Sequence, residues 1–133
     1  MKCAFGMQIK CPLLAMTVHN TSLTPYAAVA EARSANNAVT QSWGMLINRA
    51  LIATNKLIEE AEMEYDIYPI NTIHDAAYFL VKDDPMSVKF LNDTLIKEMQ
   101  WNAHPSIFSN EVKMEANLEI GKSWDKQFTL PNN

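Results

Sequence analysis

Two apolar runs lie almost end to end in residues 67–81, IYPINTIHDAAYFLV. Residues 67–74 and 77–81 are rich in β-branched and aromatic side chains, which is typical of strands. Only Asp75-Ala76 separates them, so the sequence predicts a tight hairpin. That pair lacks the Asn-Gly or Asp-Gly chemistry expected of a two-residue hairpin turn. A tight turn built from unusual residues is a place where function is expected.

A long helix is predicted upstream of this hairpin. Thr24 can cap it, and Pro25 suits its first turn. Asn36-Asn37 are poor helix formers and predict a kink or junction. Apolar side chains then recur with a 3.6-residue period, at Trp43, Leu46, Ile47, Ala50, Leu51, Leu57, Ile58 and Ala61, with Thr54 in step. The acidic run that follows predicts a solvated carboxyl end, because it opposes the helix dipole.

A second helix and a further strand are predicted downstream. Asp84-Pro85 is a helix start. Apolar residues follow at helical spacing, at Val88, Leu91, Leu95 and Met99. Residues 111–120 alternate between apolar and polar side chains, which predicts a half-buried strand. The order helix, hairpin, helix, strand indicates an α+β fold, with long helices packed on one face of a small antiparallel sheet.

The composition is that of an ordinary globular protein. The chain has 133 residues, 48% of them hydrophobic and 20% charged, with a formal net charge of −4. This excludes an intrinsically disordered chain and fits one domain. The sequence has no 18-residue apolar run, so no membrane-spanning helix is expected. Its two cysteines, Cys3 and Cys11, make no disulfide framework, which favours a reduced, cytoplasmic setting.

Charge is unevenly distributed along the chain. Residues 1–56 carry five basic residues and one acidic residue, a net charge of +4, whereas residues 57–133 have a net charge of −8. The basic half could face an anion such as nucleic acid, and the acidic half could not. The alternative is that both halves are simply solvated surface.

Several common catalytic motifs are absent from the sequence. It contains no glycine-rich phosphate loop, no CxxC pair, no HExxH and no GxSxG. Cys3, Cys11 and His19 fit no common zinc spacing. Two small groups of polar residues remain as candidates.

The first candidate is a row of three polar residues in the predicted long helix. Arg33, Asn37 and Gln41 are each four residues apart, which places them on one face. Their side chains donate hydrogen bonds, and every base pair offers an acceptor in the minor groove. The row could therefore bind duplex nucleic acid without distinguishing its sequence. The alternative is a solvated polar helix face.

The second candidate is His74-Asp75 at the predicted hairpin tip. An aspartate held on a rigid turn suits Mg²⁺, which prefers hard oxygen ligands and usually takes one or two carboxylates. The neighbouring histidine can donate a hydrogen bond to a nucleic-acid strand. The alternative is a turn aspartate that caps its own backbone, which is common.

The helix row, the hairpin tip and the later residues 121–125 follow one another along the chain in an order that resembles the carboxyl-terminal palm of family A DNA polymerases, the DNA polymerase I group. Within that group the resemblance is to the phage-type members. The family motif Arg-x-x-x-Asn-x-x-x-Gln is similar to residues 33–41, and the later His-Asp-Glu motif to residues 74–76. The family's closing Gly-x-x-Trp-Asp is similar to residues 121–125. The resemblance implies one partial palm domain over residues 1–133, with a poorly defined lead-in at 1–24, a family-like segment at 25–128 and a tail at 129–133.

The resemblance also implies a role for each matched residue. Asp75 would be one of two catalytic metal-binding aspartates, and His74 would contact the primer end. Arg33, Asn37 and Gln41 would contact the minor groove of the primer–template duplex. The implied reaction is the Mg²⁺-dependent, template-directed addition of a dNMP to a primer 3′-end, so primer–template DNA and dNTP are the expected partners. A phage-encoded chain would work in the host cell cytoplasm.

The chain departs from the family in two ways that point to an incomplete enzyme. Ala76 stands where the family usually has Glu. Two-metal chemistry needs a second carboxylate, and nothing in the sequence matches the family's upstream aspartate or the fingers helix that grips the nucleotide. We therefore expect a split or truncated polymerase, whose remaining palm and fingers come from a second polypeptide or a missing segment.

Three other interpretations stay open from the sequence. A non-catalytic remnant would bind nucleic acid through the basic half of the chain. A small interaction protein would bind no DNA even at low salt. A single-subunit phage RNA polymerase shares the His-Asp motif, but it matches residues 33–41 and 121–125 less well.

Overall fold

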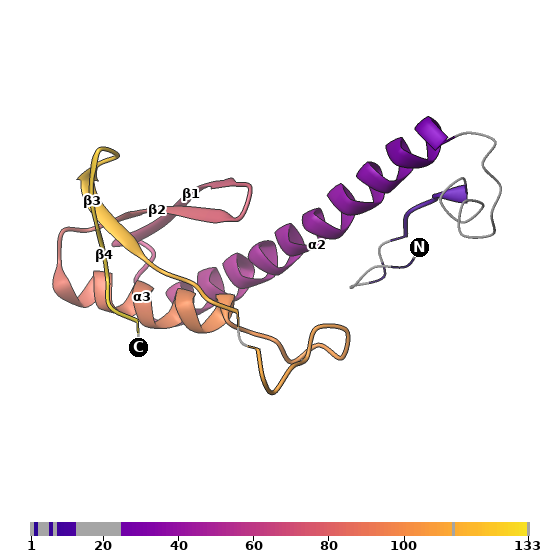
Figure 1. Cartoon of the computed structure of the whole chain (residues 1–133). Helices are drawn as coiled ribbons and strands as arrows, with labels where there is room; N and C mark the ends of the chain where they lie inside the picture. Colours follow the sequence, from indigo (N-terminus) through magenta and orange to yellow (C-terminus); the bar gives the residue numbers. More distant parts are fainter. Residues whose placement is uncertain (1, 3–5, 7, 13–24, 113, 133) are drawn as a thin grey trace. The chain divides into compact units, whose positions relative to one another are not determined.

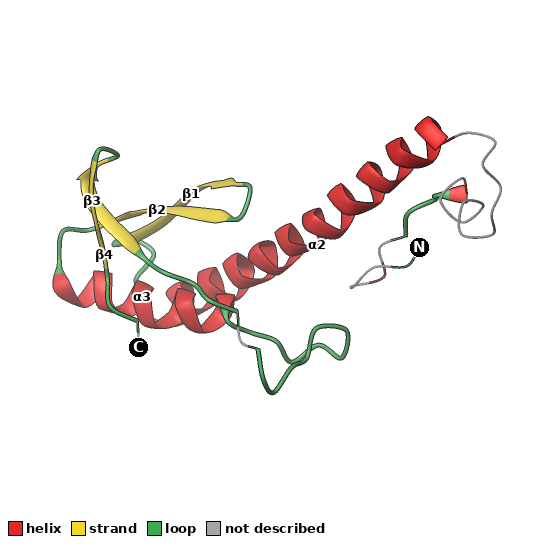
Figure 2. Ribbon diagram, in the orientation of Figure 1, coloured by secondary structure: helices red, strands yellow, loops and turns green. Residues whose placement is uncertain are grey.

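The part of the chain that the structure describes contains two long helices and four short strands (Figure 1 and Figure 2). The computed structural model describes residues 2, 6, 8–12, 25–112 and 114–132, and it divides the chain into two compact units, Met1–Met45 and Leu46–Asn133. The elements in chain order are α2 (Pro25–Glu60), β1 (Ile67–Ile73), β2 (Ala76–Val81), α3 (Pro85–Met99), β3 (Glu119–Ser123) and β4 (Lys126–Thr129). The predicted α+β class is confirmed. Two separate antiparallel pairs, β1-β2 and β3-β4, take the place of the single predicted sheet.

The helix α2 begins at Pro25, as predicted, and continues to Glu60. Thr24, the predicted cap, lies outside the described residues. Helical hydrogen bonding continues through Asn36-Asn37, where the sequence predicts a junction. Poor helix formers cost less than about 1 kcal/mol each, which a helix of this length tolerates.

The predicted apolar stripe of α2 is buried in its middle and exposed at its ends. Leu46, Ala50, Thr54 and Ile58 are buried. Trp43 is 51% exposed, and Ala61 is exposed as well. The helix that this periodicity predicts is confirmed. Its buried face is limited to the middle of the stripe, because periodicity marks a face and not how far its packing partners extend.

The carboxyl end of α2 closes with a Schellman motif. The Met63 N–H donates to the Ile58 carbonyl at 3.0 Å, and the Glu62 N–H donates to the Glu59 carbonyl at 3.1 Å. Glu62 has a φ of 56°, at the position where glycine is the usual residue. The acidic residues at this end are exposed, as predicted. The turn directs Met63 and then Ile67 into the core.

The core of the unit Leu46–Asn133 is small and joins three elements. Its buried centre consists of Ile58 from α2, Ile67 from β1, and Leu91 and Leu95 from α3. Partly buried side chains pack around this centre: Met63, Phe79, Val81, Phe90, Met99 and Leu118. Burial of one such apolar side chain contributes about 1.5–3 kcal/mol. Leu91 and Leu95 confirm the helical spacing predicted for α3.

Asp84 caps α3 at its amino end, which confirms the predicted helix start. The Ser87 backbone N–H and hydroxyl donate to Asp84 Oδ2, at 3.0 and 3.1 Å. The backbone hydrogen bond favours the charged form, so the pKa of Asp84 lies below its ordinary value. Pro85 lies in the first turn, where its missing N–H leaves no helical bond unmade.

The strand predicted over residues 111–120 is mostly absent. β3 begins only at Glu119, and residues 114–118 have no regular secondary structure. Exposure does alternate from Met114 to Ile120, but a strand also requires a hydrogen-bonded neighbour. Such pairing starts at Leu118, whose carbonyl accepts a hydrogen bond from the Leu130 N–H at 2.8 Å. The prediction is wrong for the earlier residues because alternation alone does not supply a partner.

The hairpin of β3 and β4, here called the second hairpin, depends on a glycine. Its strands pair around the two-residue turn Trp124-Asp125, with a register shift between Ile120 and Ser123. A Cβ atom on Gly121 would overlap the backbone carbonyl oxygen of Lys126. The close approach of the two backbones therefore requires glycine at this position.

Arg49 fastens α2 to the end of α3. Its Nη2 atom lies 2.8 Å from Glu98 Oε2, and its Nη1 atom donates to the Glu98 carbonyl at 3.1 Å. The guanidinium also lies over the Trp101 ring, 3.8 Å from the ring centroid. A flat group with several donors makes all three contacts at once, which lysine cannot do.

We expect Gly121→Ala to destabilise the protein by about 2–3 kcal/mol, because the added methyl group displaces the β4 backbone. Gly44→Ala is the matched control, since nothing lies within 4 Å of a Cβ at Gly44. In the interior of α2 this change stabilises by about 1 kcal/mol. Urea unfolding followed by circular dichroism measures both. Equal effects of the two substitutions would contradict the role given to Gly121.

We expect Arg49→Lys to lower the free energy of unfolding by about 1–2 kcal/mol, because lysine keeps the charge but loses the stacking and the second hydrogen bond. Arg33→Lys is the control, since Arg33 is exposed and bonds to no described residue. Thermal unfolding of both variants measures the difference. A loss of the same size in the control would contradict the stabilising role given to the contacts of Arg49.

Candidate functional site

The tip of the hairpin formed by β1 and β2, here called the first hairpin, is a two-residue turn. Ile73 pairs with Ala76, so the turn consists of His74 and Asp75. The hairpin is confirmed, but the predicted turn, Asp75-Ala76, is wrong by one position. Alternating apolar residues locate two strands without determining which residues close the turn between them.

The backbone at His74 explains how the hairpin turns without glycine. His74 has a φ of 53°, in the left-handed region. Hairpin turns of the primed types need a positive φ at the first of their two central residues. Histidine is one of the few non-glycine residues enriched in this region. His74 therefore meets a conformational need of the turn while its side chain stays exposed.

The carboxylate of Asp75 is exposed and has no hydrogen-bond or ion-pair partner among the described residues. The other five aspartates are all engaged: Asp66 with Lys82, Asp83 with Lys122, Asp84 with Ser87, Asp93 with Lys89, and Asp125 with Ser123. The alternative of a self-capping turn aspartate finds no supporting hydrogen bond. Both oxygens of Asp75 are open to an outside ligand.

The second hairpin shows why Asp75 is left unengaged. Asp125 occupies the same place there, as the second residue of a two-residue turn. The hydroxyl of Ser123, the last residue of β3, donates to Asp125 Oδ1 at 2.6 Å. The corresponding last residue of β1 is Ile73, which has no side-chain donor. The first hairpin thus lacks the side-chain donor that engages the turn carboxylate in the second hairpin.

The row of Arg33, Asn37 and Gln41 is exposed on α2. None of the three bonds to another residue in the described ranges. The row belongs to the unit Met1–Met45, whereas His74 and Asp75 belong to the unit Leu46–Asn133. The structure thus groups the predicted site residues in two sets, one on a helix face and one at a hairpin tip.

The residues similar to the family's closing motif form the turn of the second hairpin. The Trp124 ring lies 5.0 Å from the Tyr78 ring, centroid to centroid, with the ring planes 52° apart. Tyr78 belongs to β2, so this contact joins the two hairpins. Sequence reasoning missed it, and an aromatic residue at a turn is the one signal that could have indicated it.

Asp75 is a candidate metal ligand. Mg²⁺ usually binds through one or two carboxylates together with waters and substrate phosphates, and Asp75 supplies one. Within the described ranges, no group of three His, Cys, Asp or Glu side chains could hold a metal ion.

No known protein family, curated protein or solved structure matches the chain. Among the described helices, none has the apolar length that crossing a membrane requires.

Proposed function

We propose that this chain is the carboxyl-terminal palm segment of a template-directed DNA polymerase of the family A, phage-type kind. The observation that carries the proposal is the unengaged carboxylate of Asp75 at the tip of a two-residue hairpin turn. Nucleotidyl transfer needs such a carboxylate, fixed by a rigid element and open to ligands. The reaction is the addition of a dNMP to a primer 3′-end, with primer–template DNA and dNTP as substrates.

The neighbouring turn residue supports this assignment. His74 is exposed at the same tip, and the pairing of Ile73 with Ala76 fixes the backbone on either side of the turn. A histidine there can donate a hydrogen bond to the primer end while Asp75 binds metal. The family motif has the histidine directly before the aspartate, as here.

The helix row supports the nucleic-acid part of the proposal. Arg33, Asn37 and Gln41 keep their donors exposed and unengaged in the described structure. The surrounding stretch, residues 25–48, contains only two charged residues, Glu31 and Arg33. Amide and guanidinium donors on a sparsely charged face suit contact with minor-groove acceptors, which are similar for every base pair.

The proposal includes a second polypeptide or segment. Asp75 is one carboxylate, and Ala76 in place of the family's usual Glu adds none. The partner would supply the second carboxylate and the fingers, and Mg²⁺ would belong to the assembled enzyme with Asp75 as one of its ligands. The isolated chain is therefore expected to be inactive.

We expect the purified chain to give no primer extension, and coexpression with the polypeptide encoded immediately upstream to restore it. In the assembled enzyme, Asp75→Asn lowers extension more than about a hundredfold, because a neutral amide holds metal poorly. Asp125→Asn, the matched turn position in the second hairpin, leaves extension unchanged. Extension by the chain alone would contradict its incompleteness, and activity retained in Asp75→Asn would contradict the metal role.

We expect Arg33→Ala to weaken binding of the chain to a primer–template duplex about tenfold, measured by fluorescence anisotropy at low salt. The loss is equal for duplexes of different sequence, because the minor-groove acceptors are alike. Lys56→Ala is the control: it removes one positive charge from α2 outside the row, from a residue paired with Glu60.

An equal loss for Lys56→Ala would show that the helix row is not the contact. Binding that neither Mg²⁺ nor Asp75→Asn alters, together with an inactive assembled enzyme, would favour the non-catalytic nucleic-acid-binding alternative.

A further inference from the structure

The strands of the first hairpin point every second backbone group toward an outer edge. The Lys82 N–H donates to the Asp66 carbonyl, so these residues form a hydrogen-bonded pair just outside the strands. Hydrogen-bonded and non-hydrogen-bonded pairs alternate along an antiparallel ladder, and residues of the second kind point their N–H and C=O groups outward. Three pairs of that kind follow: Ile67 with Val81, Pro69 with Phe79, and Thr72 with Ala77.

The three outward positions of β1 offer no free N–H group. The Ile67 N–H donates to the Met63 carbonyl at 3.0 Å, and Pro69 has no N–H. The Thr72 N–H donates to the Asn71 Oδ1 atom at 2.8 Å. A register shift between Pro69 and Asn71 also interrupts the strand. Proline and bulges are devices by which proteins close an edge strand to other chains.

The three outward positions of β2 are open. The N–H groups of Ala77, Phe79 and Val81 have no partner among the described residues, where β2 pairs with β1 alone. β2 also contains no proline and no charged residue. A strand edge of this kind is a template for pairing with another strand.

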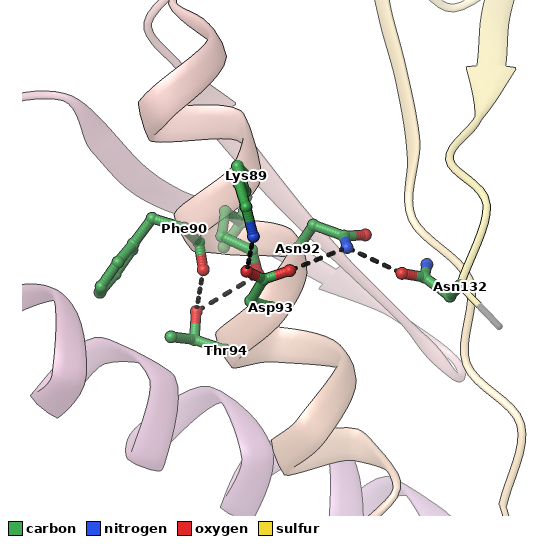
Figure 3. Close-up of polar contacts among 7 residues, drawn as sticks. Lys89, Phe90, Asn92, Asp93, Thr94 and Asn132 are labelled. Carbon is green, nitrogen blue, oxygen red and sulfur yellow. Dashed lines mark hydrogen bonds and ion pairs between the residues drawn. The ribbon is translucent and has the colours of Figure 1, made fainter.

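The second hairpin contacts β2 without pairing with it. Its strands form a sheet of their own. The segment after β4 is held on α3, where Asn92 Nδ2 donates to Asn132 Oδ1 at 2.7 Å (Figure 3). The contact with β2 is made by the rings of Trp124 and Tyr78, and side chains project from the faces of a sheet. The described structure therefore leaves the edge of β2 unpaired.

We propose that the outer edge of β2 pairs with the same edge of a second copy of this chain, in antiparallel orientation. The two-fold axis passes between the two Phe79 residues, because this is the one register in which all three outward residues meet outward residues. Ala77 then lies opposite Val81 of the second copy, and about six backbone hydrogen bonds form. The proposal uses neither the metal role of Asp75 nor the helix row, so it is independent of the polymerase proposal.

β2 itself supplies the side chains that suit its own edge. In this register Leu80, which is 61% exposed, lies opposite Tyr78 of the second copy, so each apolar side chain gains an apolar neighbour. No like charges meet along the strand, because β2 carries none. Beyond the strand, Asp75 comes opposite Asp83 of the second copy, whose charge Lys122 balances at 2.8 Å. Two marginal two-stranded hairpins thereby become one four-stranded sheet.

The first test uses the full-length chain at rising concentration. Sedimentation velocity is expected to show a reversible monomer–dimer equilibrium. Amide hydrogen exchange, followed by NMR in the same series, is expected to slow at least about tenfold at Ala77, Phe79 and Val81, and to stay unchanged in β1. In a mixture of labelled and unlabelled chains, an intermolecular NOE between the Hα atoms of Tyr78 and Leu80 identifies the register.

Two matched pairs of variants locate the interface. Ala77→Pro removes an outward N–H of β2 and weakens the dimer at least about tenfold, whereas Thr72→Pro, at the paired position of β1, does not. Leu80→Lys places a charge on the proposed interface and weakens the dimer about tenfold. Ile70→Lys, at a residue of β1 that is 57% exposed, leaves the dimer unchanged. The lysine pair decides the question if the proline variants do not fold.

Several outcomes would overturn the proposal. These are a chain that stays monomeric at every concentration, a dimer without the contact between Tyr78 and Leu80, and equal losses within both pairs of variants. A monomer whose Ala77, Phe79 and Val81 amides are already protected would show that the chain covers this edge itself. If the chain alone stays monomeric and the polypeptide encoded immediately upstream protects the same amides in a one-to-one complex, the edge belongs to that partner instead.

Discussion

Burial of Ile67 is the constraint on which the unit Leu46–Asn133 depends. This first residue of β1 is 1% exposed and lies in the core with residues of α2 and α3, whereas every later residue of β1 is exposed. The base of the first hairpin is closed by the Lys82 N–H, which donates to the Asp66 carbonyl at 2.8 Å, and by an ion pair of the same two residues at 3.0 Å. The first hairpin is thus anchored at one end, which leaves the tip with His74 and Asp75 open to solvent.

Local chemistry accounts for the elements that the sequence predicts well. The buried middle of the α2 stripe and the packing of Leu91 and Leu95 follow from helical periodicity. The start of α3 follows from the ability of Asp84 to accept a hydrogen bond from the first turn. Each of these features is determined by residues within a few positions of one another, so the sequence contains the information directly.

The features that the sequence does not predict depend instead on partners far along the chain. Residues 111–118 alternate like a strand, yet pairing begins only where Leu130 reaches Leu118. The contact between Arg49 and Glu98 joins residues that are 49 positions apart, and no nearby residue predicts it. For the candidate site, the sequence indicates Asp75 but does not show that its carboxylate is unengaged. That becomes clear only when the pairing register places Ile73 and Ser123 at the same position before the two turns, because only Ser123 has a side-chain donor.

Part of the apolar surface of the first hairpin is uncovered in the described structure. Two-stranded hairpins are marginal in water, and stable sheets usually have more strands with a covered apolar face. Ile70, Ile73 and Leu80 are large apolar residues that stay exposed on this hairpin. Under the polymerase proposal, a strand from the partner segment would cover such side chains and could carry the second carboxylate to Asp75. The proposal would then account both for the exposed apolar side chains and for the single carboxylate, which a non-catalytic nucleic-acid-binding remnant would not link.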